Sequence, residues 1–251
     1  MSITKPFRRL WRPVKGYVPG VFFENGPHPS ADYLKDDRFV CQSEIDSLVT
    51  TAHLIIRDLY ELLNYVEPCD ANLNTYSHRI YELFLRTATE FESNCKAILR
   101  DNSYTRTENI RDYFKIADAA KLAEYSITFE RWATRHEFKP FESWNTPNYT
   151  PLSWYQSYNM VKHDRYKYFS EANLKNLMYS VSGLLCILHA QYGDNMSCAC
   201  FEGISKIQWE QDKVETGTFI IQAPHFNDDE QYDFIWDNIK TGIDPVQNYA
   251  F

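Results

Sequence analysis

Residues 154–165 read WYQSYNMVKHDR and lead into residues 173–189, NLKNLMYSVSGLLCILH. In the second stretch, apolar residues return at three- and four-residue spacing: Leu174, Leu177, Met178, Val181, Leu184, Leu185 and Leu188. This spacing is typical of a helix with one broad buried face. It predicts a helix over residues 170–192 that ends near Gly193 and forms the centre of a helical bundle.

The first of these stretches predicts a helix with one polar and one apolar face. At about 100° per residue, Tyr155, Asn159 and His163 fall on one side of the helix, whereas Tyr158 and Val161 fall on the other. A neutral imidazole can accept a proton near pH 7, so His163 is the leading candidate for chemistry. The alternative is a structural His163 that hydrogen-bonds Asn159 or a neighbouring helix.

Further helices are expected upstream. Residues 43–66 carry apolar side chains at helical spacing, and residues 77–101 do so after the cap candidates Thr75 and Ser77. A third, more polar helix is predicted over residues 107–125. The bundle core is expected to contain six of the stripe residues: Leu83, Phe91, Ile98, Leu177, Val181 and Leu185.

Segments of different composition flank the helices. Residues 1–41 contain five prolines among aromatic residues, which predicts an irregular arm, and residues 126–152 predict an ordered loop anchored by rings. The C-terminal part, residues 193–251, contains a strand-like run at 218–222, and residues 201–251 hold ten acidic residues against three lysines. We therefore expect a mainly α fold with three parts: the arm, a bundle over residues 42–192, and an acidic, partly β extension with a small hairpin.

The arm contains a basic aromatic run, FRRLWR, at residues 7–12. Such a run can contact an RNA backbone and stack a base, or it can hold an acidic segment of its own chain, such as residues 228–237. The charge balance favours the second interpretation.

Composition excludes several function classes. The net charge of −8 provides no global attraction to nucleic acid. The motifs GxxxxGK[ST], GxGxxG, GxSxG and HExxH are all absent, which removes the main support for P-loop hydrolysis and for common hydrolase mechanisms. No apolar run is long enough to span a membrane or resembles a secretory signal, and we expect a cytoplasmic protein with reduced thiols.

Four residues are of the types that bind zinc: Cys186, His189, Cys198 and Cys200. Their order is unusual for structural zinc, and Cys186 lies away from the apolar arc that His189 borders. We expect neither a metal nor another cofactor.

The polar helix, the apolar helix after it and the upstream run SHRIYELFLRTATEFESNCKAIL at residues 77–99 together resemble the HEPN superfamily, across roughly residues 42–192. Members of this superfamily are antiparallel helical bundles. Many cleave RNA as homodimers in bacterial stress, toxin or anti-phage defence systems. The resemblance implies the same fold, RNA as a partner, and a homodimer formed around His163 and the 126–152 loop.

The resemblance also implies a metal-independent endoribonuclease site. In it His163 is the general base or acid, Asn159 orients the imidazole, Lys162 and Arg165 face the phosphate, and Glu90 supports the site from the neighbouring helix.

One position departs from the family pattern, which places an arginine a few residues before the histidine. Here the fifth position before His163 is Tyr158, and the nearest arginine is Arg165, after the histidine. In an unbroken helix His163 and Arg165 lie about 200° apart, so both can face one phosphate only if the helix ends near Asp164 or a second subunit supplies a cation. The alternative function is a catalytically inactive interaction or scaffold module with a protein partner.

Overall fold

The computed structural model describes residues 2–16, 33–34, 36–106, 109–193, 205–208 and 219–251. The fold is mainly α-helical, as predicted. The α-helices in chain order are α1 (Gln42–Leu62), α2 (His78–Asp101), α3 (Ile110–Ala119), α4 (Ser153–His163), α5 (Arg165–Tyr168), α6 (Leu174–Tyr192) and α7 (Trp236–Ile239). The strands are β1 (Ser126–Phe129), β2 (Glu137–Phe138), β3 (Ser205–Gln208) and β4 (Phe219–Gln222).

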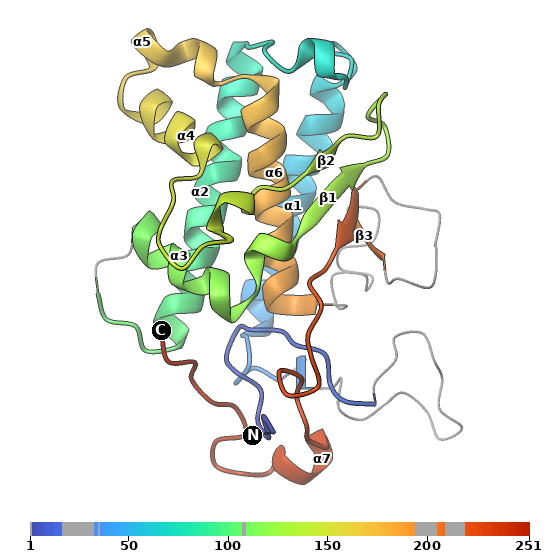
Figure 1. Ribbon diagram of the computed structural model, residues 1–251, viewed down its shortest axis with the longest axis vertical. Helices are drawn as coiled ribbons and strands as arrows, with labels where there is room; N and C mark the ends of the chain where they lie inside the picture. Colours follow the sequence, from blue (N-terminus) through green and yellow to red (C-terminus); the bar gives the residue numbers. More distant parts are fainter. Residues whose placement is uncertain (1, 17–32, 35, 107–108, 194–204, 209–218) are drawn as a thin grey trace.

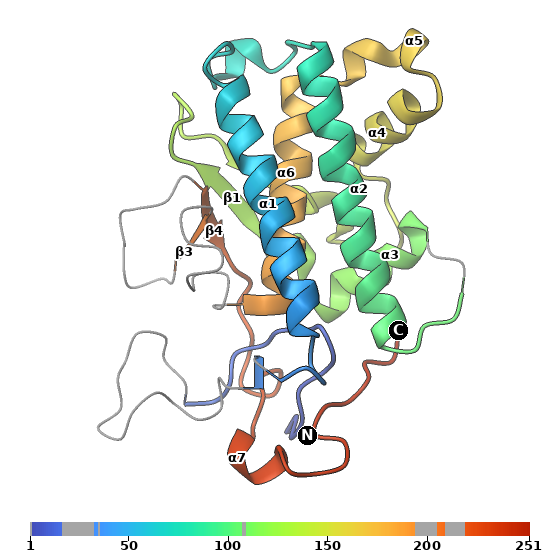
Figure 2. The same cartoon turned by 180° about the vertical axis from the view of Figure 1, so that it is seen from behind.

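Three long helices, α1, α2 and α6, run side by side along the long axis of the molecule (Figures 1 and 2). The contact between α2 and α6 is the most extensive, α4 packs on both of them, and α3 packs on α2. The six predicted core residues are all buried, which confirms the assignment of the apolar stripes: Leu83, Phe91, Ile98, Leu177, Val181 and Leu185.

Local capping explains where the helices begin and end. The Ser77 hydroxyl accepts a hydrogen bond from the Ile80 amide at 3.2 Å and starts α2 at the predicted position. Gly193 ends α6 with φ of 52°, and a Cβ at this position would overlap the indole of Trp11. The third helix is shorter than predicted, because Asn109 forms a capping box at its start and Lys121 adopts a left-handed conformation just after its end.

The segment predicted as a loop, residues 126–152, contains β1 and β2, so this prediction was partly wrong. Strand β1 pairs antiparallel with β4, in the sheet order β2-β1-β4-β3. The pairing joins Ile127 to Ile221 and Phe129 to Phe219, and all four side chains are buried. The two strands pair because this pairing buries their alternating apolar side chains next to α6.

The C-terminal region contains the strand predicted near residues 218–222, but the hairpin was wrong. Strand β4 pairs with β3 in parallel, and its antiparallel partner is the distant β1. Parallel neighbours cannot be joined by a tight hairpin turn.

The N-terminal arm packs against the C-terminal region at the end of the bundle opposite α5 (Figures 1 and 2). The Pro13 carbonyl accepts from the Tyr232 amide at 2.9 Å, and Lys15 lies 3.3 Å from the Asp233 carboxylate. The prediction that the basic arm holds the acidic segment is confirmed. Trp11 and Arg12 are buried in this contact and are not free to stack a base.

Within the described parts of the chain, no helix combines the length and the apolar composition that a membrane crossing requires.

Candidate functional site

The candidate site lies where α4 meets α5. Helix α4 ends at His163, and α5 begins at Arg165. Between them Asp164 leaves the helical conformation, with φ of −144° and ψ of 78°, and its carboxylate accepts from the Lys167 amide at 3.1 Å as the cap of α5. The separation that an unbroken helix would impose on His163 and Arg165 therefore does not apply.

His163 and Asn159 are the candidate pair for proton transfer. His163 is exposed, and Asn159, one turn earlier on α4, is half-buried. Neither side chain makes a hydrogen bond or ion pair with any other described residue, so the structural hydrogen bond considered as an alternative for His163 is not formed. Because His163 is exposed and unbonded within the described chain, its ring nitrogens are available to a ligand.

Lys162 is held in place by its neighbours on α4 and α2. Its ammonium group donates to the Tyr158 hydroxyl at 3.0 Å and lies 3.8 Å from the Glu92 carboxylate. The hydrogen bond to Tyr158 and the charge of Glu92 raise the pKa of Lys162, which therefore stays cationic. Tyr155 donates to the same carboxylate at 2.6 Å, and burial, followed by this hydrogen bond, raises the pKa of the Tyr155 phenol.

Glu92, and not the expected Glu90, is the acid of α2 that reaches α4. The two residues lie about 200° apart around the helix. Glu90 is half-buried, burial raises its pKa, and no described contact joins it to His163, Asn159 or Lys162. Both glutamates border the apolar stripe of α2, so spacing alone did not show which of them faces α4.

Tyr158, five residues before His163, belongs to the core. Its side chain is 1% exposed, its ring packs against Phe84, and its hydroxyl lies 3.4 Å from the Thr89 hydroxyl. This position contributes a phenol to the anchoring of Lys162 and contributes no cation to the surface.

Arg165 supplies a cation on the other side of the helix break. Its guanidinium lies over the ring of Tyr81, 5.6 Å from the ring centre, and the residue is exposed. Arg165 makes no ion pair within the described chain. At the corner between α4 and α5, His163 thus has a cationic residue on each side in the chain, Lys162 and Arg165.

The zinc hypothesis receives no support from the residues that can be described. Cys186 and His189 are both buried, and the Tyr125 hydroxyl bonds the Nδ1 of His189 at 2.7 Å. Cys198 and Cys200 lie outside the described residues. In the described part of the chain, no group of three or more His, Cys, Asp or Glu side chains is placed to hold a metal ion.

No family model, curated protein or solved structure matches this chain. The relationship to the HEPN superfamily remains a hypothesis that rests on the residues quoted above.

Proposed function

We propose that this chain is an RNA-binding protein of the HEPN-like type that cleaves RNA without a metal at the corner between α4 and α5. The observation that carries the proposal is the exposed His163 at the helix break, which makes no hydrogen bond or ion pair with the described residues and lies close in the chain to Lys162 and Arg165. A buried or hydrogen-bonded histidine would instead favour a structural role.

The chemistry follows from these groups. The neutral imidazole of His163 accepts the proton of a ribose 2′-hydroxyl, and this oxygen forms a bond to the adjacent phosphorus while the bond from phosphorus to the 5′ oxygen breaks. The leaving oxygen takes a proton from the imidazolium or from water. Lys162 and Arg165 stabilise the charge of the phosphorane, and Asn159 helps to orient the imidazole. The products carry a 2′,3′-cyclic phosphate and a 5′-hydroxyl.

We further propose that the protein acts as a homodimer, formed through α4 and residues 126–152. A second copy would supply the cation that Tyr158 does not provide. A role in a bacterial stress, toxin or anti-phage defence system follows only from the resemblance, and Glu90 has no part in the proposed mechanism.

A second candidate function is an inactive interaction module. The burial of Tyr158 in the position of the family arginine favours it, because the signature cation is missing from the surface. In this case the same corner would contact a protein partner.

Incubation of the purified full-length chain with RNA in excess EDTA tests the proposed function. We expect cleavage with 2′,3′-cyclic phosphate ends, and a dimer by light scattering. Cleavage that EDTA abolishes, or products with 3′-hydroxyl ends, would contradict this mechanism. If the protein is folded but cleaves no RNA under any activating condition, the ribonuclease is rejected and the interaction module is supported.

A further inference from the structure

The most exposed aromatic residues of the described chain gather at one end of the bundle. Six large apolar or aromatic side chains of the described chain are exposed, and three of these are tyrosines. Tyr65 (84% exposed) follows α1, Tyr76 (52%) precedes α2, and Tyr166 (100%) lies on α5. Both views of the ribbon place these three segments at the end of the bundle away from the chain termini (Figures 1 and 2).

Phe169, which follows α5, connects the segment around α5 with the segment before α2. Its ring lies 4.8 Å from the ring of His78 and 5.6 Å from the ring of Tyr76, both at the start of α2. Arg165, four residues before Phe169, lies over Tyr81 in the first turn of α2. Helix α5 and the residue that follows it are therefore in contact with the start of α2.

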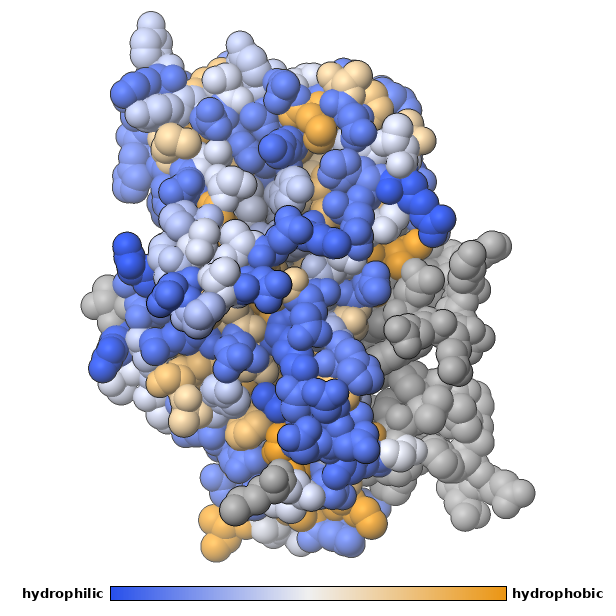
Figure 3. Space-filling model, viewed as in Figure 1, coloured by the Kyte–Doolittle hydropathy of each residue, from blue (hydrophilic) through white to orange (hydrophobic). Residues whose placement is uncertain are grey.

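This surface carries two basic residues, although the chain has a net charge of −8. Arg165 and Lys167 are exposed and make no ion pair within the described residues. Two acids lie close by in the sequence, and neither forms an ion pair with Arg165 or Lys167: Asp164 caps α5, and Glu171 accepts from the Ser157 hydroxyl at 2.8 Å. Figure 3 shows hydrophilic to intermediate residues at the α5 corner, in the upper left, instead of an apolar patch.

We infer that the α5 surface, defined as Tyr76, His78, Arg165, Tyr166 and Lys167, binds single-stranded RNA next to His163. Tyr76 and Tyr166 stack on unpaired bases, and Arg165 and Lys167 contact the phosphates. A duplex keeps its bases stacked on one another and offers these rings no base face. The choice of RNA rests on the proposed function, whereas the preference for single strands rests on the exposed rings.

Fluorescence anisotropy with a labelled single-stranded RNA, free or annealed to its complement, tests the inference on the full chain. Tyr166→Ala should weaken binding of the single strand about fivefold or more, because loss of one base stack costs roughly 1–3 kcal/mol. Tyr166→Phe keeps the stacking ring and should bind like the wild type. Ile243→Ala, at an exposed apolar residue outside the surface, is the matched control.

A double change of Arg165 and Lys167 to alanine tests the phosphate contacts. It should reduce the slope of log affinity against log salt by about 1.4, since each lost contact to a single strand removes about 0.7. An unchanged slope would remove these two residues from the interface.

Cleavage measured in the same samples separates this inference from the proposed function. Binding that depends on Tyr166 without any cleavage supports the inference and contradicts the ribonuclease. Cleavage by a protein whose affinity is unchanged by Tyr166→Ala, or equal binding of single strand and duplex, overturns the inference and leaves the ribonuclease intact. Loss of dimerisation in Tyr166→Ala with unchanged RNA affinity also overturns it, because the surface then binds a second copy.

Discussion

Two glutamates of α2, two residues apart, have opposite surroundings. Glu92 accepts a hydrogen bond from Tyr155 and faces Lys162, and its side chain is 13% exposed. Glu90 is half-buried without a carboxylate contact to α4, and burial raises its pKa. We conclude that Glu92 is the residue that fixes Lys162 beside His163.

Glu92→Gln should lower the free energy of unfolding by about 1–3 kcal/mol, because it weakens hydrogen bonds to a charged, mostly buried carboxylate. Glu90→Gln is the matched control on the same helix. It should be neutral or slightly stabilising, because a neutral amide avoids the desolvation of the carboxylate. Urea denaturation measures both, and a larger loss for Glu90→Gln would contradict our assignment.

His189 predicts a specific dependence of stability on pH. Burial lowers its pKa to about 3, against an ordinary value of 6.5. The unfolded chain binds a proton that the folded chain excludes, so this contribution is complete above about pH 6.5 and is lost between pH 6.5 and 3, by about 1.4 kcal/mol per pH unit.

Unfolding free energies across this pH range should show the slope in the wild type and a shallower slope in His189→Gln. His163→Ala removes an exposed imidazole and should keep the slope of the wild type. Equal slopes in the wild type and in His189→Gln would show that His189 is not kept neutral by the fold.

At the scale of elements, the break between α4 and α5 defines the proposed site. Asp164 ends one helix and caps the next within a single residue. This arrangement places a histidine and an arginine on either side of the break. An unbroken helix through residue 169 would instead turn the two side chains to different faces.

Asp164→Ala should loosen α5, because loss of an N-cap costs about 0.5–2 kcal/mol, and should lower RNA cleavage by releasing Arg165. Asp164→Asn retains a capping side chain without the charge and should cleave nearly as well as the wild type. Hydrogen exchange at the Lys167 amide reports the cap directly. Equal cleavage by both variants would show that cleavage does not depend on the Asp164 cap.

The long helices could be predicted because their signals are local. The stripe and the Ser77 cap defined residues 77–101, and α2 is found at His78–Asp101. Strand β1 could not be predicted in the same way, since it has four residues and its partner β4 lies about 90 residues later in the chain. The pairing depends on packing against α6, which spacing does not reveal.

The same distinction applies to the candidate site. The polar helix face with His163 and the neighbouring cations was recognised from one short stretch of sequence, which left a structural role for His163 open. The role of Glu92 depends on how α2 packs against α4, and the break at Asp164 was only one of the alternatives. Tyr158 was correctly assigned to the apolar face, and its bond to Lys162 needed the structure.

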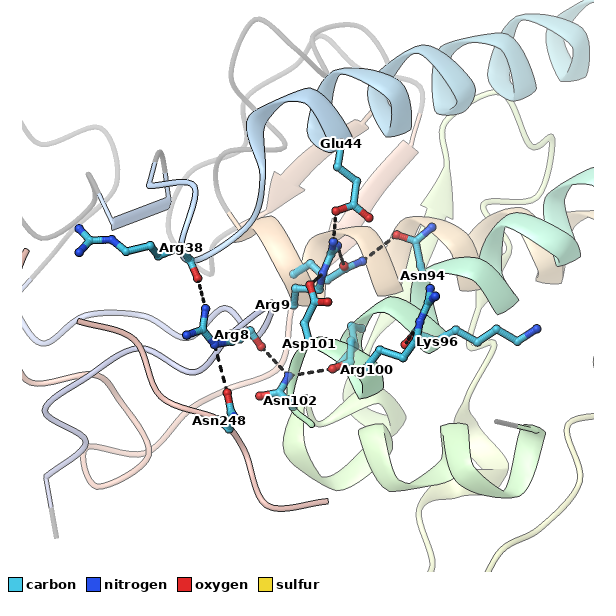
Figure 4. A network of polar contacts seen from close by, with 12 residues as sticks. Arg8, Arg9, Arg38, Glu44, Asn94, Lys96, Arg100, Asp101, Asn102 and Asn248 are labelled. Atoms are coloured by element: carbon cyan, nitrogen blue, oxygen red, sulfur yellow. Dashed lines mark hydrogen bonds and ion pairs between the residues drawn. The ribbon is translucent and has the colours of Figure 1, made fainter. Parts of the chain in front are cut away.

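At the scale of the whole molecule, one buried arginine ties the N-terminal arm to the bundle (Figure 4). Arg9, with 2% of its side chain exposed, forms ion pairs with Glu44 of α1 and Asp101 of α2. It also donates to Gln191 of α6 at 3.2 Å, and Gln191 donates to Asn94 of α2 at 2.9 Å. The arm therefore joins three helices at the end opposite α5.

Arg9→Ala should lower the free energy of unfolding by about 1–3 kcal/mol, because it removes a buried side chain and leaves the buried Gln191 without its donor, whereas the carboxylates of Glu44 and Asp101 are partly exposed and stay hydrated. Lys15→Ala is the matched control on the same arm. Its ion pair with Asp233 is partly exposed and should contribute only about 0–1 kcal/mol. Thermal denaturation compares the two, and equal losses would refute a specific anchoring role for Arg9.

The most direct test of the central claim compares His163→Ala with the wild type in two measurements on one preparation, RNA cleavage in EDTA and the melting temperature. We predict that cleavage is lost while the melting temperature stays unchanged, because an exposed side chain without protein partners contributes less than about 0.5 kcal/mol to stability. Cleavage that persists in His163→Ala, or a variant that is clearly destabilised, would contradict a catalytic His163 at the α4–α5 corner.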